Sequence, residues 1–141
     1  MQYMAIDVGE KRTGLAIGDH VSQMASPLLT IHTASQEECI RQIGRAITEN
    51  QPHALVVGLP LNMDGSDSPA SLRCAALAQV LMQRFEIDVY LVDERQTSLI
   101  ADEQMAMTGL TRKQKKNRRD SLAAANILTI FFATHHFDQA E

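Results

Sequence analysis

The sequence opens with YMAIDVGEKRTGLAIG over residues 3–18, and this stretch predicts the first two strands of a sheet. Residues 3–8 are apolar apart from Asp7, and residues 13–18 are again rich in strand-forming residues. Gly9 and the charged residues that follow it favour a tight turn between the two. We therefore expect a β-hairpin at the start of the chain.

Strands and helices then alternate along the chain. A third extended stretch is expected over residues 27–33. Ser35 followed three residues later by Glu38 is a capping box, and apolar residues at helical spacing after it predict a helix over residues 36–50. The unbroken apolar run ALVVGL, residues 54–59, is typical of a parallel strand covered on both faces.

The second half of the chain continues this alternation. Ser68-Pro69 has the pattern of a helix start, and the apolar spacing carries the helix to about residue 85. Further expected elements are a strand over residues 89–92, a helix from Thr97 or Ser98 to about Gly109, and a closing helix from Asp120 to about residue 135. Early strands followed by helix-strand units predict an α/β fold, with a mixed five-stranded sheet and helices on both faces.

Size and composition predict a single domain spanning residues 1–141. A chain of 141 residues that is 45% hydrophobic can build one core. Residues 1–8 are too short an apolar run for a signal peptide, and no run approaches the roughly 18 apolar residues of a membrane span. Cys39 and Cys74 lack the close spacing of a zinc or redox motif. We expect a cytoplasmic protein with reduced thiols and no membrane partner.

Positive charge is concentrated in one place. The formal net charge is −4, yet six of the 13 basic residues fall within residues 112–119: Arg112, Lys113, Lys115, Lys116, Arg118 and Arg119. Without them the chain holds seven basic against 17 acidic residues, a balance of −10. Because this segment lies between Gly109 and Asp120, we expect an exposed loop that attracts a polyanion.

Acidic residues occur at the ends of predicted strands, where ligands of open α/β sheets bind. Asp7 lies within an apolar strand, Asp93-Glu94 follows a buried strand, and Asp120 opens the last helix. Taken singly, Asp7 could pair with Lys11 or Arg12, Glu94 could be a solvated acid and Asp120 an ordinary N-cap. Together, three converging carboxylates form an all-oxygen cluster that suits Mg²⁺ or Mn²⁺.

Four segments in order resemble the motifs of the YqgF (RuvX) family, over nearly the whole chain. They are residues 6–16 (IDVGEKRTGLA), 57–66 (VGLPLNMDGS), 92–95 (VDER) and 120–124 (DSLAA). This resemblance implies a ribonuclease H-like fold related to Holliday-junction resolvases. It also implies a nuclease that trims the precursor of small-subunit ribosomal RNA, free or in a pre-ribosomal particle, with Asp7, Glu94 and Asp120 as catalytic metal ligands and Asp93 as the reserve for Glu94.

Two local departures from the family pattern concern the residues around these acids. Gln96-Thr97-Ser98 replaces the more usual leucine and two threonines. Ala123 stands one turn after Asp120, where junction resolvases often carry another acid, which favours RNA processing over junction cleavage.

The expected reaction is phosphodiester hydrolysis by two metals about 4 Å apart, with Asp7 bridging them and Glu94 and Asp120 each holding one. Substrate phosphates would be bound by side chains whose affinity falls with salt. The candidates outside the basic segment are Lys11, Arg12, Asn62 and Arg95. A solvated loop for the basic segment, a hairpin ion pair for Lys11-Arg12 and a plain surface loop around Asn62 are the alternatives.

Three other functions compete with this interpretation. Actin-like and sugar-kinase ATPases also begin with Asp-x-Gly, but they close two such lobes on a nucleotide, and 141 residues supply one. A Holliday-junction resolvase-like DNA endonuclease shares the fold and the acids. A non-catalytic nucleic-acid-binding regulator would keep the fold alone, and the presence of all three acids favours an enzyme. The sequence leaves the oligomeric state open.

Overall fold

A computed structural model of the chain describes residues 1–94 and 112–135, with the side chains of residues 112–121 outside that description. Its elements are β1 (Gln2–Val8), β2 (Arg12–Asp19), β3 (Met24–His32), α1 (Gln36–Asn50), β4 (Ala54–Leu59), α2 (Pro69–Phe85), β5 (Asp88–Asp93) and α4 (Arg112–Thr134). The helix expected between residue 97 or 98 and Gly109 falls outside the described residues.

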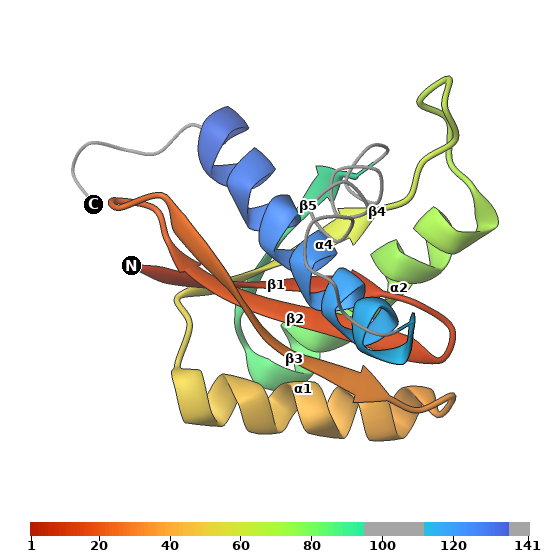
Figure 1. Cartoon of the computed structure of the whole chain (residues 1–141), viewed down its shortest axis with the longest axis horizontal. Coiled ribbons are helices and arrows are strands. Elements are labelled where there is room, and N and C mark those ends of the chain that lie inside the picture. The colour runs from red at the N-terminus through yellow and green to blue at the C-terminus, as the bar shows by residue number, and fades with distance from the viewer. Residues whose placement is uncertain (95–111, 136–141) are drawn as a thin grey trace.

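One mixed sheet of five strands organises the molecule, in the order β3-β2-β1-β4-β5 (Figure 1). β1 runs antiparallel to β2, and β2 antiparallel to β3, whereas β1, β4 and β5 are parallel. The carboxyl ends of the three parallel strands therefore meet at one edge. The predicted α/β class and the five-stranded mixed sheet are confirmed.

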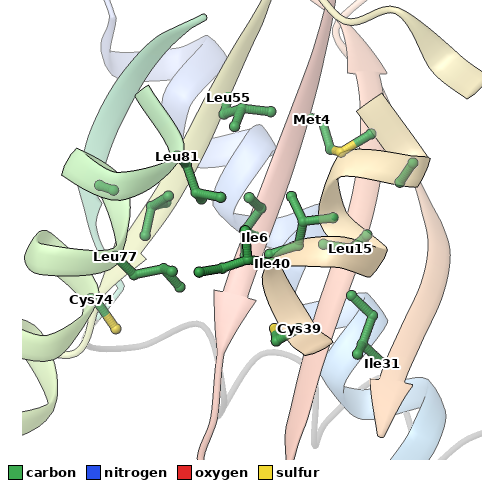
Figure 2. Packing of buried hydrophobic residues seen from close by; sticks show 14 residues of the cluster. Met4, Ile6, Leu15, Ile31, Cys39, Ile40, Leu55, Cys74, Leu77 and Leu81 are labelled. Carbon is green, nitrogen blue, oxygen red and sulfur yellow. The ribbon is translucent and has the colours of Figure 1, made fainter. Parts of the chain in front are cut away.

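Helices cover both faces of the sheet, as predicted (Figure 1). On one face α1 and α2 bury a cluster that includes Met4 and Ile6 of β1, and Figure 2 shows it between the two helices. On the other face α4 packs against a second cluster that includes Tyr3 and Ala5 of the same strand. This alternation assigns the residues of β1 in turn to the α1/α2 face and the α4 face.

Helix starts follow the sequence signals with one difference. Ser35 Oγ accepts a hydrogen bond from the backbone N–H of Glu38 at 3.2 Å. The Glu38 carboxylate binds Arg41 and Gln42 instead of reaching back to Ser35, so the predicted capping box at α1 is only half formed. At α2 both reciprocal bonds, between Ser68 and Ser71, are present.

The prediction of an exposed loop over residues 112–119 was wrong, because α4 already includes Arg112. Asp120 consequently lies inside this helix instead of capping its start. Residues 112–119 contain no glycine or proline and consist mainly of Lys, Arg and Gln, which are good helix formers. Their summed propensity outweighs the N-cap pattern at Asp120. In the part of the chain described, α4 included, no helix has the length and apolarity to cross a membrane.

Candidate active site

Asp7 lies near the carboxyl end of β1, opposite Gly14 of β2. It continues the series Tyr3, Ala5 on the α4 face, while Val8 packs on the α1/α2 face. β1 lies between β2 and β4, and Asp7 pairs with β2 one residue beyond the part of β1 that pairs with β4.

The turn after Asp7 requires a glycine. A Cβ on Gly9 would lie 2.5 Å from the backbone oxygen of Arg12, which is too close for any other residue. The predicted hairpin turn is confirmed, and it places Lys11 and Arg12 just beyond the acid. Arg12 begins β2, and the backbone oxygen of Lys11 accepts a hydrogen bond from Thr33 N–H at 3.0 Å.

Glu94 follows β5 directly and turns into the protein. Its backbone N–H donates to the carbonyl oxygen of Leu59 at 3.1 Å, and only 8% of the residue is exposed. Its carboxylate fills the space that the missing side chain of Gly58 leaves on the α4 face of β4. Asp7 and Glu94 therefore approach the same face of the sheet from two strands.

Asp93, the reserve candidate, lies on the other face. It is exposed and is paired with Leu59, which packs against the cluster beneath α1 and α2. Val89, four residues earlier on β5, packs against that cluster too. The geometry therefore supports Glu94 over Asp93 as the partner of Asp7.

Asp7 and Glu94 line one cavity of about 450 Å³ at the carboxyl ends of the parallel strands, with Arg73 and Cys74 of α2 in its wall. Burial raises the pKa of the Cys74 thiol to about 11, and the negative charges of Glu94 and then Asp7 add to the rise. The charges of both carboxylates thus act on the same Cys74 sulfur atom. Cys74 and Cys39 are buried free thiols, in agreement with the sequence prediction.

Asp120 lies in α4, seven residues before Ile127 and four before Ala124, which are both buried against the sheet. Its side chain is outside the description. Where side chains are described, no group of three His, Cys, Asp or Glu residues could hold a metal ion. The structure therefore brings together two of the three predicted ligands.

The structure places the other predicted substrate-binding residues to different extents. Arg95 lies outside the described residues, and the six basic residues of α4 are placed by their backbone only. The Asn62 side-chain amide donates to Ser66 Oγ at 3.0 Å and to the backbone oxygen of Asp67 at 3.2 Å. This amide therefore stabilises the loop over residues 62–67 through hydrogen bonds within it.

Arg73 and Cys74 were missed by the sequence analysis. Both lie on α2, whose apolar spacing was recognised, but their place beside the acids depends on how α2 packs over β1 and β4. The one available signal was their position a turn after the helix start at Ser68.

Solved structures show the same fold. RuvC of T. thermophilus, in complex with a Holliday junction substrate, matches with a TM-score of 0.62 and 18% identity over 94% of each chain. The fowlpox virus resolvase, in complex with its Holliday junction DNA, matches with a TM-score of 0.60 and 13% identity over 95% of this chain and 98% of its own. The chain therefore has the ribonuclease H-like fold, with two acids at the ends of its parallel strands.

Sequence relatives define the family. Residues 1–134 match RuvX, described as Holliday junction resolvase. A protein of Chromobacterium violaceum is 42% identical over 92% of this chain and 95% of its own, and one of Dechloromonas aromatica is 39% identical over 94% and 91%. Both bear the name "Putative pre-16S rRNA nuclease". The chain belongs to the RuvX family, and the predicted enzyme class, a nuclease, is confirmed.

Proposed function

We propose that this chain is a nuclease dependent on Mg²⁺ or Mn²⁺, which trims the precursor of 16S ribosomal RNA in the cytoplasm. The observation that carries this proposal is the convergence of Asp7 and Glu94 in one cavity at the carboxyl ends of β1 and β5. The names of the relatives supply the substrate.

The donor atoms of the cavity fit a hard divalent cation. Two carboxylates in one cavity repel each other, and a cation between them offsets that repulsion. The Cys74 thiol, with a pKa of about 11, stays protonated at neutral pH and offers no thiolate. Oxygen ligands without thiolate or imidazole suit Mg²⁺ or Mn²⁺ better than Zn²⁺.

Asp7, Glu94 and Asp120 would hold the metal, with Asp7 contributed by a central strand and Glu94 fixed by its bond to Leu59. When bound, the metal lowers the pKa of the attacking water and offsets charge on the leaving oxygen. The chain's own task is to hold the oxygens in place. The basic residues of α4 would hold substrate phosphates beside them.

Holliday-junction cleavage is the second candidate, because the family carries that description. Ala123 bears on the choice. It is 3% exposed and lies within α4, one helical turn after Asp120, where related resolvases often carry a further acid. Because alanine stands at this position, the predicted centre has three acids, and we take this as support for RNA trimming as the main activity.

A cleavage assay tests the proposal. The purified chain is incubated with a 5′-extended 16S RNA fragment, with the mature RNA end and with a four-way DNA junction, each in Mg²⁺, Mn²⁺ or EDTA. We expect the extended RNA to be cut with either metal and left intact in EDTA. Cleavage in EDTA would refute metal dependence, and preferential cutting of the junction would replace the proposed substrate.

A further inference from the structure

A second cavity, of about 410 Å³, adjoins the one that contains the acids. It lies between the β1–β2 turn, the connection from β3 to α1, and α2. The two cavities have four lining residues in common: Val8, Gly9, Glu10 and Arg73. A ligand chain that crosses this shared rim can therefore occupy both.

The walls of the second cavity are mainly apolar surface, with polar and charged side chains among it. Cys39 of α1 and Leu77 of α2 contribute apolar surface from two helices, and Figure 2 shows both among the side chains of the core cluster. Thr13 and Thr33 add hydroxyl groups. Mainly apolar walls with a few polar groups are typical of sites that bind small organic ligands.

The charge at the shared rim favours a phosphate. The described lining of the second cavity carries Lys11 and Arg73 against a single acid, Glu10. Arg73 lines both cavities, and a guanidinium can bind two phosphate oxygens at once. Arg73 thus borders both the cavity that contains Asp7 and Glu94 and the second cavity.

We propose that the second cavity is a nucleotide subsite, which receives the base next to the cleaved bond while Arg73 and Lys11 bind the phosphate at the rim. This inference rests on the proposed nuclease function and deepens it. A base can enter a cavity only when it is unpaired and unstacked. The subsite therefore selects single-stranded substrate over a continuous duplex.

The contribution of Arg73 is tested by binding without cleavage. The dissociation constant for a ten-nucleotide single-stranded RNA is measured in EDTA over a series of salt concentrations. Arg73→Gln should weaken binding several-fold and lower the log-log salt slope by about 0.7, as expected when one phosphate is no longer neutralised. Arg45→Gln is the matched control, since Arg45 is an exposed arginine paired with Glu49 on α1 and should behave as wild type.

The cavity itself is tested by filling it. Ala34 is exposed and lines the cavity, so Ala34→Leu narrows it without disturbing the core. In Mg²⁺ we expect this change to raise KM several-fold for intact RNA. Removing one base next to the cut should raise the KM of the wild type by the same factor as the Ala34→Leu change does on intact RNA. For Ala34→Leu itself, removing the base should not raise KM further. Ala133→Leu, at an exposed position of α4, is the control that should retain the wild-type KM.

The outcomes separate the two proposals. An unchanged salt slope in Arg73→Gln, or equal sensitivity of wild type and Ala34→Leu to base removal, would overturn the subsite even if the wild type cuts RNA. Metal-independent cutting would overturn the proposed function, and the binding test in EDTA would still decide the role of Arg73.

Discussion

Gly58 and Glu94 share one space on the α4 face of the sheet: a Cβ added to Gly58 would lie 2.6 Å from Glu94 Oε2. Ile127 Cδ1 lies at the same distance from that point. The absence of a side chain at Gly58 of β4 thus lets the carboxylate of Glu94, the residue after β5, enter the cavity that Asp7 also lines. Gly58, which takes no part in the proposed reaction, thus determines where the Glu94 carboxylate lies.

Gly58→Ala should therefore impair catalysis by displacing the Glu94 carboxylate. Overpacking at such a site costs about 1–3 kcal/mol, although both obstructing groups are ends of side chains and can yield. We expect kcat to fall at least tenfold. Steady-state cleavage of the extended RNA and a urea unfolding curve measure the two effects.

Ile127→Val in the same background separates packing from positioning. Valine lacks the Cδ1 atom that meets the new methyl group, so the double variant should regain part of the lost stability. Activity should remain low because Glu94 is still displaced. Recovery of both together would show that Gly58 matters only for packing.

Asp7→Asn should reduce cleavage to below about 1% of the wild-type rate and leave the fold intact. The amide keeps the shape of the side chain but removes a charge from the proposed metal site. Cleavage rate and thermal melting are compared with Glu49→Gln, an exposed acid paired with Arg45 on α1, which should match wild type. An Asn variant that cuts normally would mean that the catalytic centre lies elsewhere.

Apolar runs and the spacing of apolar residues made the strands of the sheet predictable. In β1, strand alternation places Asp7 on the same face as Tyr3 and Ala5, which both belong to the cluster beneath α4. Single-residue signals were weaker: Asp120 resembled a helix start, but the good helix formers before it extend α4 to Arg112. For Arg73 the local sequence indicated only a position about a turn after a helix start, because its place in the cavity wall depends on the packing of α2 against the strand ends.

The choice between Glu94 and Asp93 can be tested by metal titration. Glu94 faces Asp7 across the α4 face, whereas Asp93 pairs with Leu59 on the opposite face. Glu94→Gln should lower the affinity for Mn²⁺ by tenfold or more, and Asp93→Asn should leave it within about twofold. Isothermal calorimetry measures both. Loss of binding in Asp93→Asn alone would reverse the assignment.

The Cys74 thiol reports on the charge of the cavity. Burial, then Glu94, then Asp7 raise its pKa to about 11 from an ordinary value of 9.0. Glu94→Gln removes one negative charge and should lower this pKa, and so should Mg²⁺ held by the carboxylates, with EDTA restoring the first value. Thiolate absorbance is titrated in a Cys39→Ser background, with Asp93→Asn as the control.

The same shift makes stability depend on pH at the alkaline end. The pKa of Cys74 is raised in the folded protein. The contribution of this thiol to the free energy of unfolding is therefore fully present below pH 9.0 and is lost as the pH rises through about 11. Cys74→Ala should flatten the unfolding free energy over that range. An unaltered alkaline decline would assign the effect to other groups.

The basic residues at the start of α4 should bind the substrate backbone without holding the fold together. Replacing Lys113, Lys115, Lys116 and Arg118 by alanine removes four positive charges but keeps a helix-favouring sequence, since alanine has the highest helix propensity. Relief of repulsion among crowded like charges also acts in favour of the folded variant.

The quadruple variant should therefore bind single-stranded RNA more weakly, with a log-log salt slope reduced by about 0.7 for each phosphate that is no longer neutralised. Its melting temperature should change little. A salt titration beside a melting curve measures both, and Arg41→Ala, an exposed arginine paired with Glu38 on α1, shows the effect of losing a cation elsewhere. A wild-type slope would mean that these side chains do not touch phosphate. A large fall in melting temperature would mean that they stabilise α4, and the weaker binding would then follow from a damaged helix.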